Sequence, residues 1–353
     1  TCMCSGCWAC AAFCERIEIQ EGMPVLAKDC NLKVGAIRCS LEGNCYDNCP
    51  HTSFSWKALE EGTFGSAGED PVLGHYMKII GVRSKKNEVL EKAQDGGAVT
   101  SLLLCALENG LLDGAVVAAR SGDWKTSPEI VTRKEELLGG AGTKYARTPT
   151  PMKFGRGLRG ARRLGMVGTG CQTTAARRFQ STVLKYALEK TRTSDKPLNL
   201  LLIGLFCFEN FPYAGLKKVV EEEFKTPFTE VTKTDITKGK FIITKKDGST
   251  DKRPVKLFND LVPEACRICA NFTSRLADIS VGSVGTEPGW STVIVRSKKG
   301  MELVKAAEEM GYIEVTEKAD PAEVRKTDSF KDEKRKETRE KREKEGSYIP
   351  RYE

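Results

Sequence analysis

Long apolar segments are missing from this sequence. No run of 18 or more apolar residues occurs among the 353, which excludes a transmembrane helix of ordinary length. The first 50 residues contain nine cysteines and no continuous apolar stretch, so we expect no secretory signal peptide. Hydrophobic residues make up 40% and charged residues 29%, a balance typical of a globular protein with two or three domains. A small secreted domain held together by disulfides is therefore not expected.

Aromatic residues and histidines are also scarce. Aromatic residues amount to 7% of the chain and rarely alternate with basic ones, which disfavours a zinc-containing nucleic-acid module. The net charge of +8 is explained equally well by an anionic partner and by a solvated surface. The two histidines, His51 and His75, are expected in loops.

Cysteine, in contrast, is abundant: 14 are present, nine of them before Pro50. The run Cys4-x2-Cys7-x2-Cys10-x3-Cys14 has the spacing of a bacterial-type ferredoxin. In that motif three thiolates bind one cubane and the fourth cysteine reaches a neighbouring cluster. Zinc sites instead use close pairs of cysteines separated by a longer loop. The spacing therefore favours iron–sulfur clusters over zinc and over disulfides.

A second, stretched run supplies the remaining ligands of a two-cluster module. Cys45-x3-Cys49-Pro50 has the expected gap and trailing proline, but the intervals from Cys30 to Cys39 and from Cys39 to Cys45 are longer than two residues. In the first run, Glu15 follows Cys14 where a proline would be expected. The crossed ligand pattern of such modules predicts two cubanes, one on Cys4, Cys7, Cys10 and Cys49 and one on Cys14, Cys30, Cys39 and Cys45. Cys2 is left over, as a spare thiol or an alternative ligand.

Composition divides the chain into four parts. They are a ferredoxin-like module, a Gly- and Pro-punctuated linker, a core and a charged tail, at residues 1–52, 53–75, 76–315 and 316–353. The tail segment 331–345 has eight basic and six acidic residues, which predicts a charged helix. An exposed tail and an arm that grips a partner subunit are both consistent with it.

Apolar runs alternate with amphipathic stretches in the core. We expect strands at 114–119, 198–206 and 292–295, and helices at 97–108, 172–188, 213–224 and 300–310. The apolar runs do not alternate with polar residues, so these strands are expected to be buried on both faces. Residues 238–255 predict a β-hairpin about a Lys-Asp-Gly turn. The expected fold class is α+β with an α/β-like core, preceded by the cluster module and followed by the charged helix.

Five cysteines lie beyond the amino-terminal module. Cys105 lies in an apolar stretch and is expected to be a buried hydrophobic residue. Cys171 and Cys207 follow strand-like runs, where ligands converge in α/β folds. Cys266 and Cys269 form a Cys-x-x-Cys pair, which alone is equally typical of a redox dithiol or half of a zinc site.

Long segments of the core resemble a known family. QDGGAVTSLLLCALENGLLDGAVV, GTKYARTP, GTGCQ, LIGLFCFENFP and the segment from ACRIC to VIVRS are similar to the beta subunits of coenzyme F420-reducing hydrogenases and dehydrogenases. The resemblance runs from about Tyr76 to the end, about 80% of the chain. It implies a FAD-containing subunit that exchanges a hydride with the deazaflavin F420 and single electrons with iron–sulfur clusters.

The same resemblance assigns the later cysteines. It implies that one [4Fe–4S] cluster is held by Cys171, Cys207, Cys266 and Cys269. Three cubanes would then use twelve cysteines and leave Cys2 and Cys105. A ferredoxin-like module joined to a flavin subunit is similar to the electron-input subunit of F420H2 dehydrogenases, to formate dehydrogenase beta subunits and to the input half of deazaflavin-dependent sulfite reductase.

Glycine turns are the candidates for binding FAD, because backbone amides ahead of a helix bind pyrophosphate. None of the three turns is a Gly-x-Gly-x-x-Gly followed by a distant acid, and each alone is typical of a tight turn. With the family resemblance, they and their neighbours become candidate cofactor residues: Asp95, Gly96, Gly97, Thr100, Gly142, Thr143, Lys144, Tyr145, Gly168, Thr169 and Gly170.

Two further segments complete the candidate set. Glu209, Asn210 and Phe211 follow Cys207 and would stand between cluster and flavin, with strand-end capping as the alternative. Trp290 lies in a Gly-rich loop expected at the deazaflavin entrance, with a structural turn as the alternative.

Because the flavin performs the hydride transfer, no catalytic side chain is expected. The expected setting is reducing and cytoplasmic, with membrane contact made only through partner subunits. A flavin-free electron-transfer adaptor is the competing hypothesis.

Overall fold

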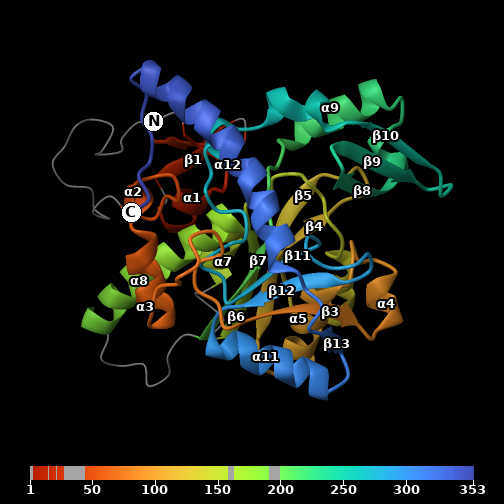
Figure 1. The fold of residues 1–353 in the computed structure, drawn as a ribbon, viewed down its shortest axis with the longest axis horizontal. Coiled ribbons are helices and arrows are strands. Elements are labelled where there is room, and N and C mark those ends of the chain that lie inside the picture. Colours follow the sequence, from red (N-terminus) through yellow and green to blue (C-terminus); the bar gives the residue numbers. More distant parts are fainter. Residues whose placement is uncertain (1–2, 15, 21, 28–43, 158–162, 191–198) are drawn as a thin grey trace.

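The computed structural model describes residues 3–14, 16–20, 22–27, 44–157, 163–190 and 199–353 (Figure 1). The predicted ligands Cys30 and Cys39, and the spare Cys2, lie outside the described residues. None of the helices in the described ranges combines the length and apolar character that a membrane crossing requires.

An eight-stranded mixed sheet forms the centre of the molecule. In spatial order its strands are β13 (Ile313–Thr316), β3 (Lys78–Ser84), β12 (Ser291–Val295), β11 (Ile279–Gly282), β7 (Asn199–Leu205), β6 (Arg163–Thr169), β4 (Gly114–Arg120) and β5 (Thr126–Val131). Strands β11, β7, β6 and β4 run parallel, and the outer pairs are antiparallel. The three strands expected from the apolar runs are confirmed as β4, β7 and β12.

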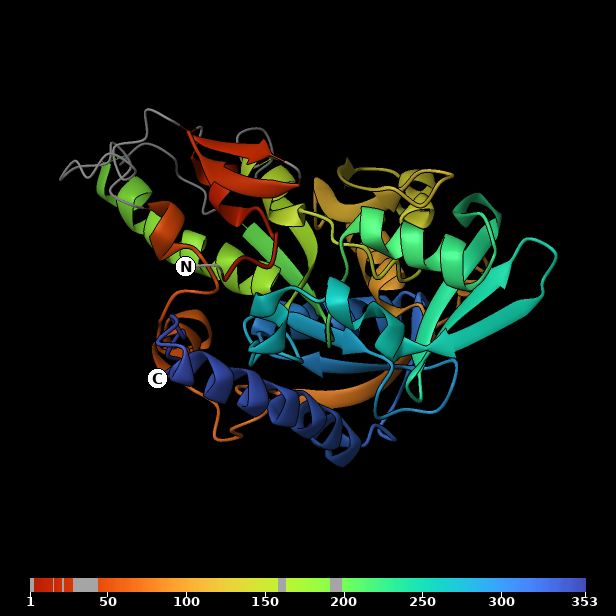
Figure 2. The same ribbon diagram turned by 90° about the horizontal axis from the view of Figure 1, so that it is seen from above.

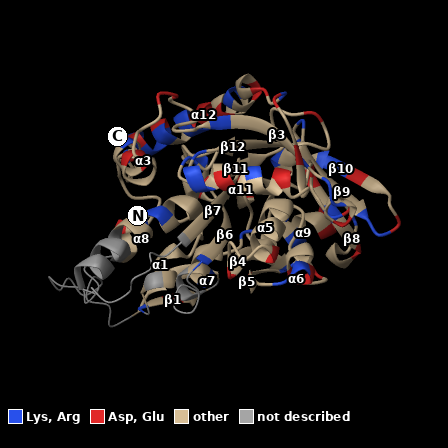
Figure 3. Ribbon diagram, turned by 90° about the horizontal axis from the view of Figure 1, so that it is seen from below, with Lys and Arg blue, Asp and Glu red and all other residues tan. Residues whose placement is uncertain are grey.

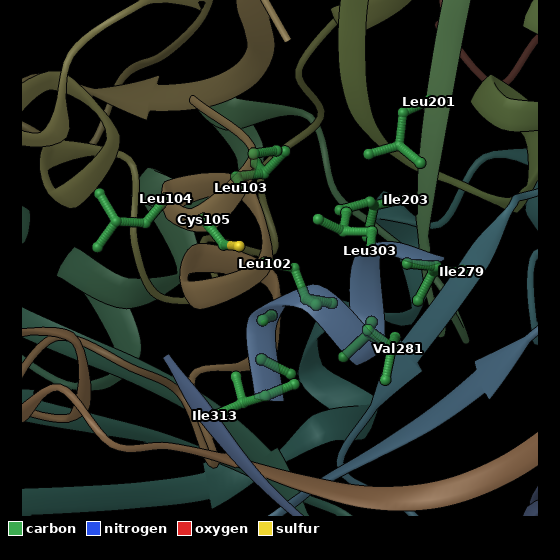
Figure 4. Close-up of a cluster of buried hydrophobic side chains, with 14 of the residues drawn as sticks. Leu102, Leu103, Leu104, Cys105, Leu201, Ile203, Ile279, Val281, Leu303 and Ile313 are labelled. Carbon is green, nitrogen blue, oxygen red and sulfur yellow. The ribbon is translucent and has the colours of Figure 1, made fainter. Parts of the chain in front are cut away.

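Both faces of this sheet are covered by helices, which explains the unbroken apolar runs. On one face, Leu201 and Ile203 of β7 pack with α5 (Ala98–Glu108) and α11 (Lys298–Glu309), as Figure 4 shows. On the other face, Leu200 and Leu202 pack with α7 (Thr150–Gly157) and α8 (Gly170–Lys190). Successive side chains of a strand point to opposite faces, so apolar residues occupy consecutive positions in the middle of such a strand.

A smaller antiparallel sheet extends the molecule. It consists of β8 (Val231–Thr237), β9 (Lys240–Lys245) and β10 (Thr250–Pro254), and the expected hairpin is confirmed as β9 and β10. Helix α9 (Tyr213–Glu223) adds to an aromatic core that contains Trp124, Phe228 and Phe241. The indole N–H of Trp124 donates to the carbonyl oxygen of Val231 over 2.6 Å, which ties this sheet to the end of β4.

Short elements surround the two sheets. They are α1 (Ala9–Phe13), β1 (Ile17–Gln20), β2 (Met23–Leu26), α2 (Asn44–Asp47), α3 (Trp56–Phe64), α4 (Asn87–Leu90), α6 (Lys134–Gly139) and α10 (Glu264–Arg267). The β1–β2 hairpin lies near α7 in Figure 2, and α1 contacts α7 and α8. The 53–75 segment contains α3, whose buried Glu60 pairs with Arg275 over 3.0 Å.

The charged carboxy-terminal helix, α12 (Pro321–Lys344), begins ten residues before the stretch of charges that predicted it. Asp320 caps it by accepting the Ala322 N–H over 2.8 Å. Figure 3 shows basic and acidic residues mixed along the helix. Val324, Lys331 and Arg342 are nevertheless buried, so α12 lies on the protein's own core. After it, Tyr352 forms a β-bridge with Phe54.

A buried ion pair fixes α8 to the central sheet. Arg177 of α8 and Asp278, just before β11, lie 2.8 Å apart, with 5% and 1% of their side chains exposed. Asp278 also accepts hydrogen bonds from the backbone N–H of Leu202 and the hydroxyl of Ser297. Burial acts to raise the pKa of Asp278, but Arg177 and Lys299 outweigh it, so the pKa lies below its usual value. The carboxylate therefore stays charged inside the core and depends on Arg177.

Arg177→Met is expected to reduce the free energy of unfolding by about 3 kcal/mol, because it removes the nearer of the two cations that pair with the buried Asp278 and leaves only Lys299, 3.3 Å away. Arg163→Met is the matched control, since Arg163 pairs with Asp113 at the surface and exposed pairs contribute below about 1 kcal/mol. Urea denaturation of both variants measures the difference. Equal, small losses of stability would contradict the assignment.

Candidate functional site

Four cysteines from three segments meet in one cavity. Cys171 lies in the first turn of α8, directly after β6, and Cys207 follows the end of β7. Because β6 and β7 are parallel neighbours, both cysteines leave the sheet at the same edge. Cys266 of α10 and Cys269 after it complete the lining of the cavity. The structure thus brings together the four cysteines that the family resemblance assigns to one cluster.

These thiols influence one another electrostatically. Burial raises the pKa of Cys207 to about 12, against an opposing effect of Lys331. Burial, followed by the neighbouring Cys171 and Cys207, also raises the pKa of Cys266 well above its usual value. A thiol must lose its proton to become a metal ligand. Several thiolates in this cavity therefore require a cationic centre between them.

Polar side chains around the cavity indicate what kind of group it accepts. His51 is 4% exposed, and within the described residues neither of its ring nitrogens has a hydrogen-bond partner. An unpaired buried polar group costs about 1–3 kcal/mol. Ser5, another wall residue, lies against Cys171. Thiols as ligands, with N–H and O–H groups beside them, fit a [4Fe–4S] cluster, whose sulfur atoms accept hydrogen bonds.

The arrangement differs from that of a single-ion site. In the described part of the chain, no group of three or more His, Cys, Asp or Glu side chains is arranged to hold one metal ion. A structural zinc site would bring its thiolates to about 2.3 Å from one point. Here the four thiols line the wall of a cavity instead.

The amino-terminal cysteines form a second group. Cys10 has its pKa raised to about 12 by burial, then by Cys49 and Cys4, which lie close to it. Burial raises the pKa of Cys7 well above its usual value, and the neighbouring Cys171, Cys49 and Cys10 raise it further. The backbone N–H of Gly6 donates to the sulfur of Cys4 over 3.2 Å, in a loop where Gly6 has a φ of 66°. Cys4, Cys7, Cys10 and Cys49, predicted as one ligand set, are therefore neighbours.

The other predicted amino-terminal set is only partly described. Cys14 is buried at the end of α1, and Cys45 lies on α2, close enough to Cys10 to raise its pKa. Their predicted co-ligands Cys30 and Cys39 lie outside the described residues. This ligand set stays a prediction.

The two described cysteine groups adjoin each other. Cys7 and Cys171 belong to one buried cluster with Ala9 and Ala175, which joins the amino-terminal module to α8. Arg178 of the same helix donates to the carbonyl oxygen of Cys49 over 2.8 Å. Helix α8 therefore holds both groups against each other.

Two of the predicted glycine loops meet away from this cavity, at β8. The backbone N–H of Thr143 donates to the side chain of Gln94, and Lys233 donates to the backbone of Gln94. Burial and the nearby Asp235 raise the pKa of Asp95, and burial, Asp235 and Asp95 raise the pKa of Tyr145, so these three side chains lie close together. The structure therefore brings the 95–97 and 142–145 loops together, and Thr100 lies buried in the α5 helix that follows the first loop.

Trp290 lies beside the first of these loops. A Cβ built on Gly96 would come within 2.4 Å of the Val82 oxygen and within 2.9 Å of the Trp290 carbonyl carbon. Only glycine fits here, because the loop packs directly on the backbones of β3 and β12. Gly97, with a φ of 72°, then begins α5.

The third glycine turn belongs to the cysteine cavity. Thr169 and Gly170 line it, and a Cβ on Gly170 would approach the backbone oxygen of Asn271 to 2.5 Å. The Thr169 N–H donates to the side chain of Gln172 over 2.9 Å, which caps α8. The turn at 168–170 therefore positions Cys171.

Two predicted cofactor residues have structural contacts of their own. The amine of Lys144 donates to the carbonyl oxygens of Gly140, Ala141 and Gly142, and burial lowers its pKa to about 7. Phe211 is fully buried in the aromatic core. Asn210 lines the cysteine cavity, and Glu209 is near enough to affect Cys207.

Sequence reasoning missed Lys331, which α12 brings to the cysteine cavity. Its amine donates to the carbonyl oxygen of Cys207 over 2.7 Å. Burial acts to lower its pKa, but the cysteine thiolates outweigh it and raise the pKa above its usual value. Nothing local distinguishes this lysine among the eight basic residues of its segment. His51 was expected as an ordinary loop residue, although its position after Cys49-Pro50 was a usable signal.

The sequence and the fold of this chain are similar to those of known proteins. Residues 79–153 match the amino-terminal model, and residues 161–321 the carboxy-terminal model, of the family described as "Coenzyme F420 hydrogenase/dehydrogenase, beta subunit". The beta subunit of the coenzyme F420 hydrogenase of Methanosarcina barkeri is 39% identical over 251 residues, 70% of this chain and 84% of that protein. An F(420)H(2) dehydrogenase subunit of Methanosarcina mazei is 33% identical over 63% of this chain and 60% of that protein.

A solved structure is similar over most of its length. A chain of the F420-reducing [NiFe] hydrogenase complex from Methanosarcina barkeri superposes with a TM-score of 0.69 and 34% identity, covering 78% of this chain and 94% of the other. The carboxy-terminal family model spans the segment that contains all four cavity cysteines. The chain therefore belongs to the family of coenzyme F420 hydrogenase/dehydrogenase beta subunits.

Proposed function

We propose that this chain is an oxidoreductase subunit that exchanges a hydride with coenzyme F420 and single electrons with a partner subunit, using FAD and three [4Fe–4S] clusters. The observation that carries the proposal is the convergence of Cys171, Cys207, Cys266 and Cys269 on one cavity with a buried lysine and histidine at its wall. A bound flavin would couple two-electron hydride chemistry to one-electron transfer, which the clusters require.

The chain's own residues hold and insulate these groups. The four cavity cysteines are assigned to one cluster, and Cys4, Cys7, Cys10 and Cys49 to a second. Cys14 and Cys45, with Cys30 and Cys39, are assigned to the third. The contact between Cys7 and Cys171 supports transfer between the first two ligand sets, because electron transfer requires short gaps.

Flavin binding is assigned to the loops that meet at β8. The turns at 95–97 and 142–145 carry glycines with positive φ at Gly97 and Gly142, where no side chain blocks the backbone amides. The backbone of Trp290 adjoins Gly96 of the first loop, and we assign its indole to one side of the bound group. Because the flavin supplies the reactive atom, these residues bind and orient it and exclude water.

The partner is proposed from the module arrangement. An amino-terminal ferredoxin-like module joined to this family's core suits an electron-input subunit of the F420H2 dehydrogenase type, and a beta subunit of a hydrogenase or formate dehydrogenase is the alternative. Membrane contact would then be made through partner subunits. Anaerobic purification of the native protein and identification of the subunits that accompany it distinguishes these assemblies.

Reduced F420 is expected to bleach the flavin absorbance of the anaerobic protein, whereas NADH leaves it unchanged. Stopped-flow absorbance measures both reactions, and acid extraction measures FAD per chain. Bleaching with NADH alone would contradict the assigned substrate. Full iron without extractable FAD would instead identify a flavin-free adaptor.

Cys266→Ala is expected to remove one cluster, or roughly four of about twelve irons per chain, because its thiol is assigned as a ligand. Cys105→Ala is the matched control: Cys105 is fully buried among apolar side chains of α5 and is expected to leave iron unchanged. Colorimetric iron and acid-labile sulfide assays measure the result. Equal iron in the two variants, or zinc in place of iron, would refute the assignment.

A further inference from the structure

Helix α12 carries a lysine into the cysteine cavity. The side chain of Lys331 is 5% exposed and lines the cavity together with Cys171, Cys207 and Cys269. Its amine donates to the backbone oxygen of Cys207 over 2.7 Å. A carbonyl oxygen is neutral, so this hydrogen bond fixes the ammonium without cancelling its charge.

Neighbouring charges on the same helix do not replace this one. Asp328, one turn earlier, is half-buried, and its negative charge partly offsets the positive charge of Lys331. Arg335, one turn later, interacts electrostatically with Cys269, but it also forms an ion pair with Asp332. Glu209, next to the cavity, adds a negative charge. Lys331 is therefore the cation of α12 that is buried against the thiols themselves.

We propose that Lys331 is a positioning residue that raises the reduction potential of the cluster held by Cys171, Cys207, Cys266 and Cys269. This inference rests on the proposed function, which assigns a [4Fe–4S] cluster to that cavity. It concerns how readily the cluster gains an electron, whereas the proposed function concerns only which residues hold it.

The physical reason is the charge of the thiolate-bound cubane. A [4Fe–4S] centre with four thiolates is an anion in both oxidation states, and one electron makes it more negative by one unit. A nearby cation therefore stabilises the reduced state more than the oxidised state, and the effect is large where water is excluded. The step is a one-electron reduction in which no bond to Lys331 forms or breaks and its proton stays on Nζ.

This role explains why so charged a helix packs on the core. Helix α12 lacks a continuous apolar stripe, yet its inward positions include Val324, Lys331 and Arg342. Arg342 bonds to Glu264, which is in α10 with Cys266. Helix α12 is thus fixed at two points, by Lys331 on the backbone of Cys207 and by Arg342 on Glu264 of α10.

A purely structural role for Lys331, as an anchor of α12 on Cys207, predicts a different result. Loss of an anchor would loosen the helix and lower cluster content, but it would not shift the potential of clusters that remain. The midpoint potential is therefore the decisive readout.

The experiment compares Lys331→Gln with the charge-retaining Lys331→Arg and with Lys336→Gln. Lys336 is the matched control because it lies on the same helix with 69% of its side chain exposed. Anaerobic potentiometric titration followed by electron paramagnetic resonance measures each cluster of the full chain. The signal of the cavity cluster is identified as the component of the resonance spectrum that is missing in Cys266→Ala, and the potential of that component is compared among the variants.

Lys331→Gln is expected to lower the ratio of reduced to oxidised cluster at a fixed potential about tenfold, equivalent to about 59 mV for one electron. Lys331→Arg and Lys336→Gln are expected to leave that ratio near its original value. An unchanged ratio in Lys331→Gln with full iron overturns the inference, and so does an equal shift in Lys336→Gln. If Cys266→Ala removes no component, the proposed function itself fails, which is a distinguishable outcome.

Asp328→Asn decides the question if Lys331→Gln does not retain its cluster. Removing this half-buried carboxylate takes away the negative charge that partly offsets Lys331. The cavity cluster should therefore become easier to reduce. An unchanged potential, or a shift in the opposite direction, would overturn the inference.

Discussion

Mutual repulsion among cysteine thiolates in a water-poor cavity is the constraint on which the rest of this structure depends. Cys171, Cys207, Cys266 and Cys269 come from separate segments, and burial disfavours their charged forms. The apolar core does not bring such groups together for its own stability. The end of β6 with the start of α8, the end of β7, and α10 with the turn after it hold the four thiols at one cavity, which supports the proposed cluster.

The surroundings of the cavity follow from that constraint. Lys331 supplies positive charge, and His51 supplies ring nitrogens that have no protein partner within the described residues. The Arg177–Asp278 pair fixes α8, and with it Cys171, to the sheet. Close backbone approaches at Gly96 and Gly170 leave both turns little freedom to shift. Rigid support of this kind favours electron transfer, which requires little rearrangement of the groups around a redox centre.

The cavity also links the parts of the molecule. Helix α8 contacts the amino-terminal cysteines at two points: Cys171 and Ala175 pack against Cys7, and Arg178 bonds to the backbone of Cys49. Strand β6, which precedes α8, belongs to the central sheet. The carboxy-terminal residues return to the 53–75 segment, where Tyr352 packs on Phe54 and Trp56. Segments from both ends of the chain thus surround the cysteines, so the amino-terminal segment and the core form a continuous structure around the proposed site.

Local pattern in the sequence determined much of this architecture. The unbroken apolar run of β7 predicted a strand buried on both faces, and the Lys-Asp-Gly turn predicted the β9–β10 hairpin, because both signals act over a few neighbouring residues. The ferredoxin spacing singled out Cys4, Cys7 and Cys10, since short loops alone limit where their thiols point. Only the tertiary structure decided that Lys331 is buried, that Lys144 bonds within its own loop and that Phe211 belongs to an aromatic core. Burial depends on what lies across from a side chain, and that neighbour comes from a distant part of the chain.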